Sequence, residues 1–165
     1  MSSPIIRRLR CEEAELFRAI RLEALANSPE AFGTTFAKQA ADPMSYFAET
    51  LQEATVFGAF LGAKIVGMAG LRRESGERMQ HKGMLWGMYV RRAVEGRGLG
   101  RALVQAVLAH AGEVVEQVQL TVVTDNERAR RLYESEGFVI YGLERQALKL
   151  GERYLDEYLM VRFLT

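Results

Sequence analysis

The stretch that most constrains the fold of this chain runs from Leu85 to Val107. Its first six residues, L-W-G-M-Y-V, are rich in large and aromatic side chains, which is typical of a buried strand. Its last part carries apolar residues at three- and four-residue spacing, which predicts one face of a helix (Leu99, Ala102, Leu103, Ala106 and Val107). Between the two lies the segment Gly96-Arg97-Gly98-Leu99-Gly100. The sequence therefore predicts a strand, a glycine turn and a helix in succession.

This arrangement of residues suits an anionic ligand. Alternating glycines permit left-handed dihedrals and leave backbone N–H groups uncovered by any Cβ. A helix that starts in such a turn adds four unpaired amides and the positive end of its dipole. Arg97 and Arg101 flank the turn and can add charge-assisted hydrogen bonds. The turn is thus a candidate seat for a phosphate or diphosphate, and the alternative is a surface loop that uses glycine only for turning.

Two widespread phosphate-binding patterns do not fit this turn. The dinucleotide pattern G-x-G-x-x-G fails, because Arg101 stands where Gly96 would require the third glycine. The P-loop pattern fails too, because no G-K-[ST] follows a glycine loop in the sequence.

The turn does resemble motif A of the GNAT superfamily of acyl-CoA-dependent N-acetyltransferases, Q/R-x-x-G-x-G/A, over residues 95–100. Glu95 departs from the Gln or Arg of the family, and we expect its carboxylate to face solvent, since a diphosphate would repel it. Residues 126–138 resemble the second signature of the family, N-x-x-A-x-x-L-Y-x-x-x-G-F, at every lettered position. The order of predicted elements agrees with the family over nearly the whole chain.

The resemblance implies a single N-acetyltransferase domain over residues 1–165, with an α/β fold. A mixed, mostly antiparallel central sheet of six to seven strands is flanked by about four helices and is splayed at its two central strands. Periodicity and turn residues predict strands over 5–10, 55–61, 65–71, 85–90, 118–123, 154–163 and from 138 to 141. They predict helices over 12–26, 43–53, 99–112 (ended by Gly112) and from a Thr124–Glu127 capping box to Gly137, with a loop over 30–36.

In the family, the pantetheine arm of acetyl-CoA lies in the gap between the splayed strands. The backbone of Met88, Tyr89 and Val90 would pair with this arm like a neighbouring strand. The resemblance places Asn126 against the cofactor arm as well. The backbone amides of the turn would hold the diphosphate (Gly96, Arg97, Gly98, Leu99, Gly100 and Arg101).

Tyr133 is the residue that we expect to carry the chemistry, because in the family this tyrosine faces the thioester sulfur. A phenol, with an ordinary pKa near 10, stays protonated at neutral pH and can donate its proton to a leaving thiolate. Spacing on the helix alone would equally predict a core tyrosine beside Ala129 and Leu132.

The acceptor amine must lose a proton, and the base is not evident from the sequence. Some family members place a glutamate on the motif A strand, but the corresponding residue here is Met84. Histidine is the side chain most often used as a base near neutral pH, and His81 is one candidate. Weaker candidates are carboxylates on elements that surround the acceptor in the family (Glu23, Glu30 and Asp156). Deprotonation through water is an equal alternative.

Other side chains have more ordinary interpretations. Trp86 and Tyr89 could line a pocket, but aromatic residues in a central strand are typical of a core. Arg128, Arg130 and Arg131 fit a solvated helix face, although they could reach the 3′-phosphate of CoA. No metal site is predicted, since the two histidines are far apart and Cys11 is the lone cysteine.

The bulk composition narrows the class of protein. Lys and Arg total 22 against 21 Asp and Glu, so the formal charge of +1 gives no electrostatic case for nucleic acid or membrane binding. One cysteine excludes an intrachain disulfide and favours the cytoplasm.

The expected function is transfer of an acetyl group from acetyl-CoA to a small-molecule or peptide amine, by direct attack in a ternary complex. The alternatives are an acyl-CoA-binding sensor or interaction protein without turnover, and an acyltransferase that uses a different acyl donor. Family members often form homodimers, so the resemblance also implies a homodimer as one expectation.

Overall fold

The computed structural model describes residues 3–164 of the chain. Within this range the strands are β1 (Ile5–Arg8), β2 (Thr55–Leu61), β3 (Lys64–Arg73), β4 (Lys82–Val90), β5 (Gln117–Val123), β6 (Val139–Leu150) and β7 (Arg153–Phe163). The α-helices are α1 (Ala14–Asn27), α2 (Phe36–Ala40), α3 (Met44–Glu53), α4 (Leu99–Val114) and α5 (Glu127–Ser135). Short 3₁₀ helices cover Cys11–Glu13, Pro29–Ala31 and Arg92–Val94.

The strands form one seven-stranded sheet in the order β1-β2-β3-β4-β5-β7-β6. Neighbouring strands are antiparallel except β4 and β5, which are parallel. The predicted mixed, mostly antiparallel sheet is therefore confirmed. The predicted hairpin of β2 and β3 is present as well, and its turn contains Gly62 at a φ of +62°.

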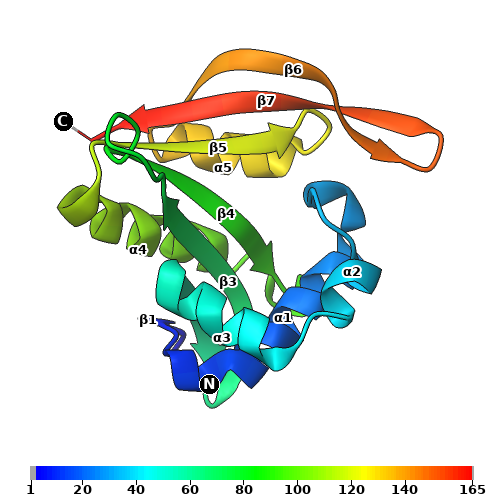
Figure 1. Cartoon of the computed structure of the whole chain (residues 1–165), viewed down its shortest axis with the longest axis vertical. Helices are drawn as coiled ribbons and strands as arrows, with labels where there is room; N and C mark the ends of the chain where they lie inside the picture. The colour runs from blue at the N-terminus through cyan, green and yellow to red at the C-terminus, as the bar shows by residue number, and fades with distance from the viewer. Residues whose placement is uncertain (1–2, 165) are drawn as a thin grey trace.

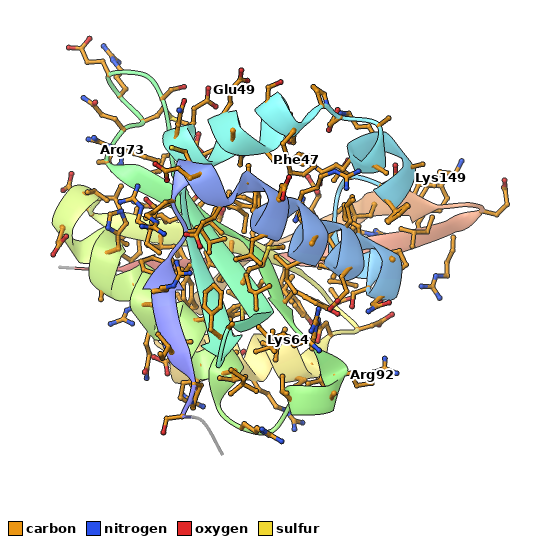
Figure 2. All side chains as sticks on the ribbon, turned by 90° about the horizontal axis from the view of Figure 1, so that it is seen from below. Phe47, Glu49, Lys64, Arg73, Arg92 and Lys149 are labelled. Carbon is orange, nitrogen blue, oxygen red and sulfur yellow. The ribbon has the colours of Figure 1, made fainter. Side chains whose placement is uncertain are left out.

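Helices cover both faces of the sheet, so the protein has two apolar clusters (Figure 1). One cluster packs α4 against the central strands and includes Leu103, Val107 and Leu120. The other packs α1 and α3 against β2 and β3 and includes Phe17 and Phe47. Figure 2 labels Phe47 between the two helices, where its side chain is fully buried.

The sheet is splayed between β4 and β5, as predicted. The two strands pair only from Lys82 to Met84 on β4 and from Gln117 to Gln119 on β5. Beyond this point the ribbons of β4 and β5 diverge (Figure 1). The register of β3 against β4 shifts opposite this region, and Gly87 has a φ of +70°. Such a bulge bends a strand, so β4 turns away from β5 where the pairing stops.

Several local predictions need correction. Gly112 does not end α4, which continues to Val114. The N-cap of α5 is Asn126 rather than Thr124, since the Asn126 side chain accepts a hydrogen bond from the Ala129 amide. Residue 36 does not belong to a loop but begins α2, where Thr35 caps the helix by accepting a hydrogen bond from the Lys38 amide. The polar residue that caps α2 therefore indicates this helix, whereas the spacing of apolar residues does not.

Strand β6 is longer than the sequence predicts, because it continues from Val139 to Leu150. Its side chains are mostly exposed on both faces, and its register against β7 shifts twice. A strand without a buried face shows no alternation of apolar and polar residues, so its stability comes from pairing with β7. None of the helices between residues 3 and 164 combines the length and apolarity needed to cross a bilayer.

Candidate active site

A cleft of about 680 Å³ opens where β4 and β5 separate. Its walls come from the unpaired part of β4, from β5, from the start of α5 and from β7. Residues 30–33, which follow α1, close another side. Backbone groups of β4 that face the gap lack a strand partner there, so an extended ligand with amide groups can pair with them.

The glycine turn before α4 forms as predicted. Gly96 and Gly98 have φ of +81° and +78°, and Gly98 is the N-cap of α4 with no side-chain cap. A Cβ on either glycine would meet nothing within 4 Å, so the backbone conformation and not the space requires glycine. The first hydrogen bond of α4 runs from the Ala102 amide to the Gly98 carbonyl. The amides from Gly98 to Arg101 therefore precede the helical ladder, where an anion can accept from them.

The charged side chains beside this turn pair with α5. Arg101 does not point its guanidinium at the turn as predicted, because Nη1 lies 2.6 Å from Glu136 Oε1 and 3.0 Å from Ser135 Oγ. Glu95 borders the cleft, and its Oε2 lies 2.8 Å from Arg128 Nη1. Glu95 is thus exposed, but it borders the cleft rather than facing away from it as expected, and an arginine of the second motif pairs with its charge.

The predicted pantetheine-binding segment lies on the splayed part of β4. Met88 lines the cleft. Tyr89 directs its side chain away into the core, where its hydroxyl donates to Glu23 Oε2 at 2.9 Å and accepts from Asn27 Nδ2 at 3.1 Å. Val90, which ends β4, pairs with Gly67 of β3. The backbone of this segment is therefore anchored on one side by β3 and free of β5 on the other.

Asn126 and Tyr133 line the same cleft from α5. Asn126 Oδ1 accepts from the Ala129 amide at 3.2 Å, which fixes the side chain and leaves its NH₂ group as a donor. Tyr133 is 5 % exposed and packs edge-to-face on Phe138, with 5.9 Å between the ring centroids. Burial raises the pKa of the Tyr133 phenol far above its ordinary value of 10. The phenol is therefore fully protonated at neutral pH, as a general acid must be.

Of the three carboxylates predicted as bases, one lines the cleft and two are bonded to other groups. Glu30 lines the cleft. Glu23 instead pairs with Arg91 at 2.8 Å, and this hydrogen-bonded arginine lowers the pKa of Glu23. Asp156 Oδ1 accepts from the Gln146 amide at 2.8 Å.

His81 is not brought together with Tyr133. It lies just before β4 in a different hollow, which also contains Arg73. The cleft with Tyr133 contains Arg92, and Figure 2 shows Arg73 and Arg92 on opposite sides of the molecule. A proton acceptor at His81 would therefore be remote from the unpaired part of β4.

Glu157 on β7, a carboxylate that the sequence pattern did not indicate, also lines the cleft. Burial raises the pKa of Glu157, the negative charge of Glu144 adds to the effect, and a hydrogen bond with Thr121 opposes it. Alternation along a strand could have revealed Glu157, since successive side chains point to opposite faces. Leu155 and Glu157 share the face that lines the cleft, while Asp156 points to the other.

The model of the Acetyltransferase (GNAT) family matches residues 17–138. The chain belongs to the GNAT family. N-alpha-acetyltransferase RimI of Mycobacterium tuberculosis is 37% identical over 105 residues, which cover 64% of this chain and 63% of that protein. The chain thus spans less than two thirds of the length of the curated relative that it matches.

Solved structures have the same fold. A GNAT-family acetyltransferase from Streptococcus pneumoniae superposes with a TM-score of 0.87 at 23% identity, over 99% of this chain and 100% of that chain. The yncA protein of Salmonella typhimurium, solved with its cofactor acetyl-CoA, gives 0.83 at 19% identity over 99% and 95%. The GNAT fold inferred from the two motifs is thereby confirmed.

Two polar groups in this GNAT cleft stand outside both motifs. Arg21 of α1 and Trp86 of β4 line it, and each has a buried nitrogen without a hydrogen-bond partner among residues 3–164, Arg21 Nη1 and Trp86 Nε1. The sequence position of Arg21 could have identified it, because it follows Phe17 by four residues and so lies on the core-facing side of α1. Trp86 was expected in the core, and it packs there while its ring also reaches the cleft.

Metal ligands do not gather in the described part of the chain: between residues 3 and 164 no cluster of three or more His, Cys, Asp or Glu side chains could hold an ion. The charged groups that line the cleft are arginines and carboxylates from separate elements.

Proposed function

We propose that this GNAT-family chain is an N-acetyltransferase that moves an acetyl group from acetyl-CoA to the primary amine of a small molecule or peptide. The observation that carries the proposal is the buried phenol of Tyr133, which lines the same cleft as the unpaired segment of β4 and Asn126. Acetyl-CoA has a long arm with amide groups, a diphosphate and a thioester. The strand gap suits the arm, the helix terminus suits the diphosphate, and the proton donor suits the thioester.

The long arm of the co-substrate would lie between β4 and β5, with its amides paired to the free edge of β4. Its diphosphate would accept from the backbone amides of Gly96 to Arg101, where the dipole of the 16-residue helix α4 favours negative charge. The NH₂ group of Asn126 would add a donor from the opposite wall. These contacts direct the thioester toward Tyr133.

In the reaction, the amine nitrogen attacks the thioester carbonyl carbon. A C–N bond forms while the C–S bond breaks, and a backbone N–H of β4 stabilises the oxyanion that develops. The departing thiolate takes the phenolic proton of Tyr133. Glu157 takes the proton that the amine loses, since its raised pKa makes it a better proton acceptor than an ordinary carboxylate. One proton then returns from Glu157 to the phenolate through water, which restores both groups.

Steady-state release of CoA with a panel of amines tests the proposal. The panel should contain amino acids, polyamines, aminoglycosides and peptides with free N-termini, each with acetyl-, propionyl- and succinyl-CoA as donor. The account predicts turnover above background with acetyl-CoA and at least one amine class. Tight CoA binding without turnover would identify a sensor instead, and a preference for propionyl- or succinyl-CoA would identify another acyltransferase. The cytoplasmic location and the homodimer stay predictions.

A further inference from the structure

Two side chains that line the cleft, Arg21 and Trp86, each carry an unused hydrogen-bond donor. Arg21 is 9 % exposed, and its Nε donates to Gln39 Oε1 at 2.9 Å, while its Nη1 has no partner among the described residues. Trp86 Nε1 is likewise buried without a partner within residues 3–164. Buried donors in native proteins are nearly always paired, so two in one cleft need an explanation.

The two groups are neighbours. The Arg21 Cζ atom lies 5.6 Å from the centre of the Trp86 ring and 4.9 Å from that of Phe32. The guanidinium thus lies over two aromatic rings, which favour a cation but do not replace a hydrogen-bond acceptor for its N–H groups. Arg21, Trp86 and Phe32 all line the cleft, so the side chains that carry these two buried donors border the space that a ligand would occupy.

The charge of Arg21 is also uncompensated. No carboxylate pairs with Arg21 in the part of the chain that the structure describes. Burial lowers the pKa of Arg21, Tyr46 opposes this effect, and the positive charge of Arg72 adds to it. A buried guanidinium without a counter-ion is costly. A ligand that brings a negative charge into the cleft would compensate it.

Arginine and an adjacent N–H donor match a carboxylate in particular. The planar guanidinium and the indole N–H can each donate to one of its two oxygens, and such charge-assisted bonds are about twice as strong as neutral ones. A neutral carbonyl offers one oxygen and no charge.

From this geometry we propose that the acceptor is an amine that carries a carboxylate, held by Arg21 and Trp86, so that the substrate is a free amino acid rather than a peptide N-terminus. This inference rests on the proposed acetyl transfer and specifies its substrate class. A peptide presents a neutral carbonyl where the amino acid presents its carboxylate, and it would leave both donors unsatisfied.

The test compares each of the twenty standard amino acids with its α-carboxamide, at equal concentration and with acetyl-CoA as donor. The best free acid should exceed its carboxamide about 10- to 100-fold in kcat/KM, which is the contribution expected of charge-assisted hydrogen bonds. The comparison is stringent, because the amino group of a carboxamide has the lower pKa and is more often in its reactive neutral form.

Variants connect this preference to the two donors. Arg21→Gln removes the charge, and Trp86→Phe removes the indole N–H while keeping an aromatic ring. Each should reduce the acid-to-carboxamide ratio, Arg21→Gln by about tenfold or more. The ratio is measured on one enzyme preparation with both substrates, so a variant that folds less completely cannot change it. Arg18→Gln, on the same helix but bonded to the Ala40 carbonyl, is the matched control and should preserve the ratio.

The possible outcomes are distinct. Equal kcat/KM for acids and carboxamides, or turnover confined to amines without an anionic group, would overturn the inference while the acetyltransferase proposal stands. An unchanged ratio in both Arg21→Gln and Trp86→Phe would overturn it too, and would leave ordered water as the partner of these donors. Absence of turnover with every amine would refute the proposed function itself.

Discussion

Glu95 and Arg128 form an ion pair, with 2.8 Å between Glu95 Oε2 and Arg128 Nη1. The pair joins the turn before α4 to the first turn of α5, so it links the two sequence motifs of the family across the protein. Glu95 stands where motif A has Gln or Arg, and it places a negative charge beside the proposed diphosphate seat.

Glu95→Gln should strengthen binding of acetyl-CoA several-fold. The substitution removes the repulsion between carboxylate and diphosphate and frees Arg128 to interact with phosphate. Isothermal titration calorimetry at two salt concentrations measures the effect, which should shrink at the higher one because salt screens exposed charges. Glu113→Gln, on the exposed side of α4, is the control. Weaker binding by Glu95→Gln would instead mean that the ion pair positions the turn.

Tyr133→Phe should reduce kcat by about 10²- to 10⁴-fold, the usual range for loss of a general acid. The phenylalanine ring retains the edge-to-face contact with Phe138, so the fold and the affinity for acetyl-CoA should change little. Stopped-flow or steady-state kinetics and calorimetry give the two quantities. Tyr141→Phe, which removes an exposed hydroxyl on β6, should behave like the native enzyme. Native kcat in Tyr133→Phe would remove this residue from the mechanism.

Glu157→Gln should lower kcat/KM by about 10²-fold and change its pH dependence. In the native protein the raised pKa of Glu157 means that kcat/KM falls as the pH drops through that value, because the carboxyl group is then protonated and cannot accept the amine proton. This acid limb should be missing in Glu157→Gln. Asp156→Asn is the matched control, since the neighbouring side chain bonds to the Gln146 amide instead. Glu30 would become the candidate base if the acid limb persisted.

Stability should depend on pH through Glu13 and Arg7, which are joined by two hydrogen bonds of 2.9 and 2.8 Å. The Arg7 guanidinium lowers the pKa of Glu13 from 4.5 to about 2. A lowered pKa means that this stabilisation is complete above pH 4.5 and is lost as the pH falls from there toward 2.

Glu13→Gln should therefore reduce the free energy of unfolding by about 1 kcal/mol at neutral pH, a modest value because the Arg7 side chain is 42% exposed and solvent screens the pair. Urea denaturation at several pH values should show the difference disappearing toward pH 2. Glu12→Gln, an exposed neighbour, should have little effect at any pH. A difference that persists unchanged in acid would point to packing rather than charge.

The sequence was sufficient for the parts of the fold that local rules govern. Leu85 to Val107 folds as strand, glycine turn and helix because its apolar spacing and its glycines each permit one local structure. The seven-stranded sheet and its splay came from the resemblance of residues 95–100 and 126–138 to the GNAT motifs, and the structure confirms them.

The remaining features depend on contacts between distant residues. Arg101 pairs with Glu136 through the packing of α4 on α5, and nothing near either residue indicates it. Arg21 and Trp86 meet because α1 packs against β3, the strand that pairs with β4, although the two residues are far apart in the sequence. On β7, Leu155 and Glu157 line the cleft and Asp156 does not, so strand alternation distinguishes Glu157 from Asp156 once the face of one neighbour is known.

The most direct measurement is a titration of ¹⁵N-labelled protein with acetyl-CoA, followed by the backbone amide signals in NMR spectra. The account predicts saturable shifts that are largest for the amides from Gly96 to Arg101 and from Met88 to Val90, because these groups would bind the diphosphate and the pantetheine arm. Saturable shifts confined to other residues, or no shift at any concentration, would contradict it.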